Sequence, residues 1–494
     1  MADEVGTLVR DAPESLCLLY PSPYHVGMSS LGFQTIYRSI NEAPGRAAHR
    51  AFLPEDTEAF RAARIPLFTY EAERPVGDYP VVGVSVAYEL EIAGLIEALE
   101  LAGIPPLAED RDPTRHPFVL AGGPLTFSNP LPLAPYVDAV LMGEADQTVH
   151  QALDVLFGTR GRDEALAVLA REIPSCFVPA LHGDAMPPVA RADDEGLPAR
   201  SQILTPHTEL REMFLVEPER GCHRGCEYCV MRRSTNGGMR LFDPARVLAY
   251  VPEQARRVGL VGAATTDHPK ITEIVEALVD SGREVGLSSL RADRLDDRFV
   301  AALVRGGQTV LTTAADGASA RLRRLIQRRA PDDALLRSAE LVKRHGMRRL
   351  KLYMMVGLPT ETDEDIDELI EFSLELAKIA PLSLGISPFC AKRNTPLDGA
   401  EFAGIGTIDG RLKRLRRGVR GRVELRATSA RWTWVEYMLA QGGRPEGRAV
   451  LDAVRAGGSF RAWKRAFDAL PADRPRRALV RPGNRVSRRL RVTG

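Results

Sequence analysis

Glu219-Arg-Gly-Cys-His-Arg-Gly-Cys-Glu-Tyr-Cys-Val230 is the run of sequence that says most about this chain. Its three cysteines, Cys222, Cys226 and Cys229, stand close enough to share one loop. Thiolates gathered in this way ligate iron–sulfur clusters. A cluster of four irons normally takes four cysteines, so three leave one iron open to another ligand. The run therefore predicts an iron–sulfur site with one open coordination position.

A structural zinc site is the main alternative interpretation of these cysteines. Such sites usually need four ligands, often as two Cys-x-x-Cys pairs, and the sequence has no second pair. The remaining cysteines, Cys17, Cys176 and Cys390, are isolated, and we expect each to be a small buried hydrophobe. Because nothing marks the chain as secreted, disulfide bonds are not expected either.

The composition is that of a large protein without a membrane span. The chain has 494 residues, of which 44% are hydrophobic and 27% charged. This length allows roughly two to four domains. Apolar runs break well before the ~18 residues that a membrane helix needs. The acidic segment Met1–Ser15 lacks the apolar core of a signal peptide, so we expect a cytoplasmic protein.

Charge is distributed unevenly along the chain, although the formal net charge is only +1. Residues 401–494 hold 23 lysines and arginines against 8 aspartates and glutamates. Such a surplus suits contact with a polyanion such as RNA, or with an acidic protein. A codon bias towards arginine, combined with solvated helix faces, explains the same surplus without any partner. Both interpretations stay open.

Strand and helix patterns alternate through residues 211–400, which predicts a parallel sheet with helices between the strands. Right-handed crossovers between six such strands give a partial (β/α)6 barrel. The cysteine run follows the first strand, and active sites of such barrels gather at the carboxyl ends of the strands. Motif and position therefore agree. The predicted strands are Met213–Glu217, Val258–Gly262, Glu284–Ser288, Gln308–Thr313, Arg349–Val356 and Leu382–Ser387.

The N-terminal residues 13–160 are predicted to form a separate α/β domain with a doubly wound, Rossmann-like fold. Ligands in such folds bind at the carboxyl ends of the strands, so the loops there are the positions of interest. Residues 161–210 are predicted as a connecting module, and residues 401–494 as a mainly helical, basic C-terminal region. The predicted N-terminal strands are Leu16–Tyr20, Val81–Ala87, Phe118–Gly122 and Ala139–Met142.

The spacing C-x3-C-x2-C, with Tyr228 just before the last cysteine, resembles the signature of the radical SAM enzymes. The resemblance implies that Cys222, Cys226 and Cys229 hold a 4Fe–4S cluster. In that family the open iron chelates S-adenosylmethionine (SAM), and an electron from the cluster cleaves it to a 5′-deoxyadenosyl radical. The resemblance also implies a reducing partner such as flavodoxin or ferredoxin.

Other strand ends resemble the SAM-binding segments of the same family. The turn at Gly262 stands where the family has a glycine-rich, GGE-like motif, but it lacks the acidic residue. Ser289 and Arg291 offer a hydroxyl and a guanidinium for the ribose hydroxyls and the carboxylate of SAM. Gly357 begins a turn that resembles the segment packed on adenine. With Tyr228, these residues are the predicted SAM contacts.

The N-terminal loops resemble those of the cobalamin-binding domain that precedes many radical SAM barrels. Ser85 ends one strand, Gly122 and Gly123 follow the next, and Gly143 comes after a third. These are the predicted cobalamin contacts. The resemblance, to a branch of bacterial proteins in which both domains are fused, covers roughly residues 15–470. The D-x-H-x-x-G motif that supplies a histidine to cobalt is absent, so either cobalamin is held without that ligand or the domain has lost it.

The resemblance implies a radical SAM enzyme whose expected reaction is cobalamin-dependent C-methylation of an unidentified substrate. A non-methylating radical reaction without cobalamin, such as a rearrangement or ring formation, is the first alternative. An iron–sulfur redox sensor or RNA-binding protein without catalysis is the second. The sequence assigns no catalytic acid, base or hydrogen donor. Asp316 and Glu361 are carboxylates at the predicted barrel mouth, where an ion-pair role fits each equally well.

Overall fold

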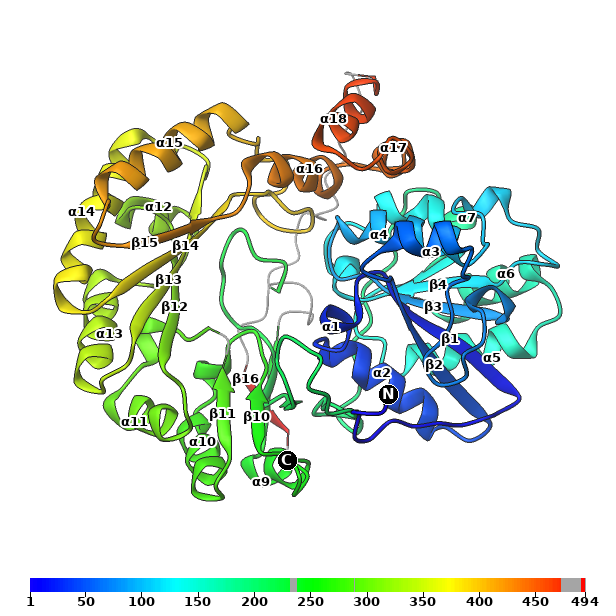
Figure 1. The fold of residues 1–494 in the computed structure, drawn as a ribbon, viewed down its shortest axis with the longest axis horizontal. Coiled ribbons are helices and arrows are strands. Elements are labelled where there is room, and N and C mark those ends of the chain that lie inside the picture. Colours follow the sequence, from blue (N-terminus) through cyan, green and yellow to red (C-terminus); the bar gives the residue numbers. More distant parts are fainter. Residues whose placement is uncertain (232–237, 288, 472–489, 494) are drawn as a thin grey trace. The chain divides into compact units, whose positions relative to one another are not determined.

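The computed structural model describes residues 1–231, 238–287, 289–471 and 490–493 (Figure 1). The described residues divide into two compact units. The first consists of Met1–Glu212 together with the segment that begins at Met438. The second contains the described residues between Met213 and Tyr437 and the C-terminal strand. The first unit is therefore discontinuous in sequence.

A mostly parallel sheet forms the centre of the first unit. Within the described residues its strand order is β2-β1-β3-β4-β5-β6, and only β6 runs antiparallel to its neighbour. This order reverses direction between β1 and β3, as in doubly wound folds. The predicted parallel α/β fold is thus present. The strands are β1 (Glu14–Tyr20), β2 (Arg46–Phe52), β3 (Val81–Ser85), β4 (Phe118–Gly122), β5 (Ala139–Leu141) and β6 (Cys176–Phe177).

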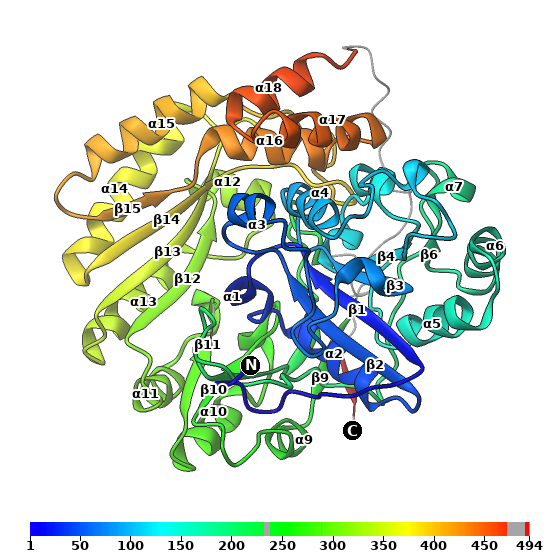
Figure 2. The ribbon, with the colours of Figure 1, turned by 45° about the vertical axis from the view of Figure 1, so that its right-hand side comes forward.

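Helices cover both faces of this sheet, with α4 on one face and α2 and α5 on the other (Figures 1 and 2). Helix α2 begins after Ser30, whose hydroxyl accepts a hydrogen bond from the Phe33 N–H and so caps the first turn. The helices of the first unit are α1 (Tyr24–Gly27), α2 (Leu31–Glu42), α3 (Thr57–Ala63), α4 (Glu91–Leu101), α5 (Thr148–Gly158), α6 (Arg162–Glu172), α7 (Pro179–His182), α17 (Arg444–Arg455) and α18 (Phe460–Asp468).

The residues predicted as a connecting module, 161–210, lie within the first compact unit. Strand β6 extends the sheet, because Cys176 and Phe177 are fully buried and pair with β5. Helix α17, from the predicted C-terminal region, also belongs to this unit. Tyr136 donates its hydroxyl to the Gly447 carbonyl at 2.5 Å, and a Cβ on Gly447 would lie 2.2 Å from the Pro132 carbonyl oxygen. These compact units therefore differ from the predicted domain boundaries.

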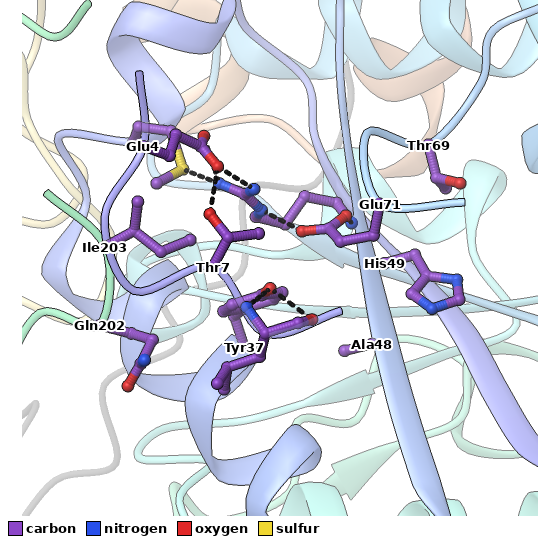
Figure 3. Close-up of polar contacts among 12 residues, drawn as sticks. Glu4, Thr7, Tyr37, Ala48, His49, Thr69, Glu71, Gln202 and Ile203 are labelled. Atoms are coloured by element: carbon purple, nitrogen blue, oxygen red, sulfur yellow. Dashed lines mark hydrogen bonds and ion pairs between the residues drawn. The ribbon is translucent and has the colours of Figure 1, made fainter. Parts of the chain in front are cut away.

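Strand β2 was not predicted, because its sequence Arg-Ala-Ala-His-Arg-Ala-Phe carries charged side chains into the core. Arg50 is fully buried, and its guanidinium lies 2.5 Å from Glu71 and 2.7 Å from Glu4 (Figure 3). Although burial opposes ionisation, the hydrogen bonds and charge of Arg50 lower the pKa of Glu4 to about 2. Two carboxylates thus neutralise the buried cation, and the N-terminal segment that carries Glu4 is tied to the sheet.

The second unit is built on a curved run of parallel strands with helices on its outer side (Figures 1 and 2). Strands β7, β10 and β11 pair with one another, and so do β12 to β15. A bridge between Leu290 and Thr313 joins the two groups. All six predicted strands are present, and β15 adds one that was not predicted. They are β7 (Met213–Val216), β10 (Arg257–Leu260), β11 (Glu284–Leu287), β12 (Val310–Asp316), β13 (Arg349–Val356), β14 (Leu382–Pro388) and β15 (Glu424–Ala427).

Helices alternate with these strands, as expected for right-handed crossovers. Helix α14 has a capping box in which Asp365 accepts a hydrogen bond from the Thr362 N–H at 2.8 Å. The helices are α9 (Pro244–Ala249), α10 (Ile271–Asp280), α11 (Asp297–Arg305), α12 (Ala320–Leu325), α13 (Asp332–Arg344), α14 (Asp363–Ile379), α15 (Ile405–Gly418) and α16 (Ala430–Ala440).

A small sheet lies beside the cysteine run. Strand β8 (Glu219–Gly221) pairs antiparallel with β9 (Met239–Phe242), which pairs parallel with β16 (Leu490–Thr493). Strand β8 ends immediately before Cys222, so this sheet anchors the start of the cysteine loop. The rest of the predicted basic C-terminal region, residues 472–489, lies outside the described residues. In the described part of the chain, no helix has the length and hydropathy that crossing a membrane would require.

Candidate active site

The three cysteines of the motif lie on one loop directly after β8. Cys226 is buried, while Cys222 and Cys229 are half-buried. Burial raises the pKa of Cys222 to about 12, and the neighbouring thiols Cys229 and Cys226 raise it further. The three thiols are therefore close enough to interact electrostatically. Ligation to a metal offsets this cost because the cation stabilises the thiolate.

A four-iron cluster and a single metal ion require different arrangements of ligands. Among the described residues, no three Cys, His, Asp or Glu side chains converge as ligands of one metal ion. In a four-iron cubane each cysteine binds a different iron, so the thiols need to surround a volume instead of meeting at a point. The iron–sulfur site at Cys222, Cys226 and Cys229 therefore stays a prediction from the spacing of the cysteines.

An ion-pair cluster around Asp267 holds the first half of the cysteine loop. The Asp267 side chain is fully buried after β10, and its carboxylate accepts a hydrogen bond from Arg224 Nε at 2.7 Å. Arg294 donates to it at 3.1 Å, and Arg291 Nε lies 3.9 Å away. Burial opposes ionisation, but the hydrogen bond and charge of Arg224 hold the pKa of Asp267 below its usual range. The loop is thus fixed to the ends of β10 and β11.

Tyr228 and Asp316 fix the second half of the loop to the end of β12. The Tyr228 hydroxyl donates to Asp316 Oδ2 at 2.6 Å, and Arg328 Nε lies 2.8 Å from the same oxygen. Burial raises the pKa of Tyr228, and the charge of Asp316 raises it further, so the phenol stays protonated and donates. Asp316, left open between two roles by the sequence, is thus in an ion pair.

Glu219 is a buried carboxylate that sequence analysis missed. Its Oε1 accepts a hydrogen bond from the Ala264 N–H at 2.8 Å. Its Oε2 is buried and has no hydrogen-bond partner among the described residues. Burial raises the pKa of Glu219 to about 8. An acid with one unsatisfied oxygen, held against the predicted Gly262 turn, is the feature expected where a cation binds.

Gly262 is the residue that lets this carboxylate approach the turn. A Cβ at Gly262 would lie 2.1 Å from Glu219 Oε1, so any larger residue would displace the acid. No local pattern marks this contact, because Glu219 and Gly262 stand 43 positions apart, the first on β8 and the second in the turn after β10. The Gly262 turn lacks the acidic residue of the GGE-like motif, but Glu219 of β8 places a carboxylate beside the same turn.

The other predicted SAM contacts are less closely grouped. Arg291 is buried and donates to Asp293 and to the Arg329 carbonyl at 2.9 Å. Ser289 is exposed at the end of β11. Gly357 is buried, and its N–H donates to Glu361 at 2.8 Å.

Glu361, the second open carboxylate, also lies in an ion pair. Arg411 Nη1 lies 2.9 Å from its Oε1. The acid therefore closes the turn at Gly357 and ties it to α15. The structure thus links the cysteine loop to Gly262 and Arg291, while Gly357 belongs to a neighbouring strand–helix junction.

The four predicted cobalamin residues lie along one edge of the first unit's sheet. Ser85 pairs in register with Gly122 at the carboxyl ends of β3 and β4. Thr126 links the other two, since its hydroxyl donates to the Gly123 carbonyl and accepts from the Gly143 N–H.

The space beside these glycines is only partly open. A Cβ on Gly123 would lie 2.6 Å from the Val86 carbonyl oxygen, and one on Gly143 would lie 2.6 Å from the backbone of Ala190. A Cβ on Gly122 would lie 3.9 Å from its nearest neighbour, the Leu141 carbonyl oxygen. Gly123 and Gly143 therefore serve the packing of the loops, and Ser85 and Gly122 are left as the accessible part of the predicted site.

Two family models match the chain, one in each compact unit. Residues 32–179 match a model described as radical SAM proteins, N-terminal, and residues 216–373 match the radical SAM superfamily. A protein of Methanocaldococcus jannaschii, described as uncharacterized protein MJ0966, is 25% identical over 407 residues. That similarity covers 79% of this chain and 80% of the relative.

Solved structures of the cobalamin-dependent SAM radical enzyme OxsB have a similar fold. With aqua-cobalamin bound, OxsB matches with a TM-score of 0.51 at 12% identity, covering 74% of this chain. With SAM also bound, the TM-score is 0.50 at 11% identity, covering 83% of this chain. The chain spans only 53% and 56% of the OxsB chain in these comparisons. The OxsB comparisons show a similar fold, and the two family models show that the chain carries the N-terminal domain of radical SAM proteins followed by a domain of the radical SAM superfamily.

Proposed function

We propose that this radical SAM enzyme binds SAM between the cysteine loop and the Gly262 turn and uses it to methylate a carbon atom of its substrate with the help of cobalamin. The observation that carries the SAM site is Glu219, a buried acid with an unsatisfied oxygen that lies close against the Gly262 turn. Its position next to a three-cysteine loop supports a SAM molecule that meets both.

Each residue has a distinct task in this proposal. When bound, a 4Fe–4S cluster supplies the single electron that cleaves the sulfonium group of SAM. Cys222, Cys226 and Cys229 hold it, and Glu219 accepts hydrogen bonds from the SAM amino group. Arg291 lies 3.9 Å from Asp267, the acid that holds the cysteine loop, and its guanidinium suits the SAM carboxylate. An ammonium group beside Glu219 favours the ionised acid and so offsets the effect of burial.

Cobalamin is proposed at the carboxyl edge of the first unit's sheet. The strand order reverses between β1 and β3, and ligands of doubly wound folds bind at that point. Ser85 ends β3 there, and Gly122 leaves open space beside it on β4. Two solved structures of OxsB, whose fold is similar, have aqua-cobalamin bound, which supports cobalamin as a ligand of this chain. Cobalamin, when bound, supplies the methyl group that a substrate carbon radical takes up.

The test is anaerobic reconstitution of the full chain with iron, sulfide and hydroxocobalamin, followed by dithionite and SAM. We expect 5′-deoxyadenosine together with about one bound corrinoid per chain. Deoxyadenosine without bound corrinoid would remove the methylation proposal and leave a radical SAM reaction of another kind. A Cys226→Ala variant is the control, and it should lose the cluster absorbance and all deoxyadenosine formation.

A further inference from the structure

The segment that follows β12 forms an arginine-rich hollow on the surface of the second unit. The hollow has a volume of about 640 Å³ and is lined by α12 and the residues after it. Its lining residues include four arginines and one acid, which are Arg323, Arg324, Arg328, Arg329 and Asp332. Of the side chains that line this hollow, Arg328 also belongs to the Tyr228–Asp316 contact of the cysteine loop.

Only part of this positive charge is neutralised within the protein. Arg328 pairs with Asp316 at 2.8 Å, and Arg323 pairs with Asp332. Arg324 and Arg329 are exposed, and neither side chain has an ion-pair partner among the described residues. Leu325 is exposed to 44% beside them. A concave surface with unpaired guanidiniums and an exposed leucine has the character of a protein-docking site for an acidic partner.

The backbone of Ile326 and Gln327 contacts the cysteine loop, and Gln327 also lines the hollow. The Gln327 carbonyl oxygen lies 4.0 Å from Cys226 Sγ. The Ile326 carbonyl accepts a hydrogen bond from the Glu227 N–H at 3.0 Å. Gln327 itself lines the hollow, so one residue separates a molecule bound there from a cluster ligand. An electron can cross one residue, whereas a substrate bound in the hollow would be separated by that backbone from the proposed SAM site.

We propose that residues 320–332 form the docking surface for a small acidic electron-carrier protein, such as a flavodoxin, which reduces the cluster through Gln327 and Cys226. This inference rests on the proposed function, because it assumes a cluster at the cysteine loop. The carrier loses one electron and the cluster gains it, so no bond forms and no proton moves. The charge of Arg324 and Arg329 attracts the carrier, and the exposed Leu325, next to Arg324 in the sequence, adds an apolar contact.

The test compares the double variant Arg324→Glu/Arg329→Glu with a matched control, Arg416→Glu/Arg417→Glu. The control arginines are also exposed, lie on α15 of the same unit, and have no ion-pair partner among the described residues. The first readout is the Kd of a fluorescently labelled bacterial flavodoxin for each reconstituted full-length protein, at low and at physiological salt. We expect the Kd of the double variant to rise about tenfold or more, with a weaker salt dependence, and that of the control to stay within about twofold.

The second readout is the rate of deoxyadenosine formation with reduced flavodoxin, divided by the rate with dithionite. This ratio should fall about tenfold in the double variant and stay unchanged in the control. If dithionite yields no deoxyadenosine from the wild-type protein, the proposed function fails, while the Kd comparison still decides the docking surface. Equal Kd values for wild type and double variant would overturn the inference. So would unchanged flavodoxin binding with loss of binding to a labelled single-stranded RNA, which would assign the arginines to nucleic acid.

Discussion

Glu219 stands three residues before Cys222, in the sequence run that predicted the cluster, yet its role depends on a contact with Gly262. The cysteine spacing could be read directly, because the ligands share one loop and their chemistry is specific. The carboxylate could not, because its partner comes from another strand and nothing local marks a buried acid. A short-range pattern thus predicts ligands on one loop, whereas contacts between strands need the fold.

Replacing Glu219 by glutamine should weaken SAM binding by about 10- to 100-fold, because a charge-assisted hydrogen bond to the SAM amino group is lost. The cluster should be retained, since Glu219 is not a ligand. Equilibrium dialysis with labelled SAM gives the Kd, and iron content with absorbance gives the cluster. Glu217→Gln is the control, because Glu217 pairs with Arg220. Equal SAM affinity in Glu219→Gln and wild type would refute the assignment.

The raised pKa of Glu219 predicts how the stability of the cluster-free protein changes with pH. Burial raises the folded-state pKa from 4.5 to about 8, and the neighbouring Glu217 and Asp267 also raise it, while Arg220 lowers it. The folded protein therefore keeps a proton that the unfolded chain releases. The contribution of protonated Glu219 to the stability of the fold is fully present below about pH 4.5 and is lost as the pH rises through about 8.

Thermal melting at pH 5.5 and 8.0 checks this sign, with Glu219→Gln as the reference that cannot ionise. The melting temperature of the wild-type protein, relative to the variant, should be lower at pH 8.0 than at pH 5.5. A difference that stays constant between the two pH values, or grows in the opposite direction, would contradict a protonated Glu219.

At the scale of elements, the strands that were predicted are short segments rich in apolar residues, either in a continuous run, as in Leu16–Tyr20, or in alternation, as in Leu382–Ser387. Strand β2 was missed because Arg46, His49 and Arg50 interrupt its pattern, although each is buried with a partner. Strand β15 was missed because its four residues Glu-Leu-Arg-Ala are partly exposed and pair with β14 alone. Tertiary partners decide such elements, and local propensity does not contain them.

Asp267 connects three elements through the cysteine loop, and its loss should loosen the loop. In Asp267→Asn, Arg224, Arg291 and Arg294 lose the buried charge that holds them together. We expect the cluster to be lost to a chelator about tenfold faster, as for other residues that orient metal ligands. The half-life of the cluster absorbance measures this. The control is Asp280→Asn, an exposed acid paired with Arg305 on the surface, which should leave the half-life unchanged.

At the scale of the whole molecule, the order of domains could be predicted but the boundaries of the compact units could not. Asn129 donates its amide to the carbonyls of Leu439, Ala440 and Gly442, more than 300 positions away. This side chain therefore joins the end of α16 to the first unit. The strand and helix pattern suggested a boundary near residue 160 and the change in charge one near residue 400, but neither carries information on which distant segments pack together.

The buried Arg50 should be essential for the stability of the first unit. Arg50→Met leaves Glu4 and Glu71 buried without their cation, which costs about 3–5 kcal/mol for a buried pair. Hydrogen–deuterium exchange should show faster exchange in β1 and β2 and unchanged exchange in β13. Arg171→Met removes an exposed arginine and should change neither. Unchanged protection of β2 in Arg50→Met would show that the pair contributes little.

The discontinuity of the first unit has a consequence for anyone who wishes to excise it. A fragment ending at Glu212 would lack α17, and with it the cover of Pro132 and the acceptor of the Tyr136 hydroxyl. Such a fragment would expose to solvent the apolar surface that α17 covers, and we expect it to aggregate on its own. Adding the peptide 438–471 in trans, or joining it to residue 212 by a short linker, would restore the contacts that α17 makes with the rest of the first unit.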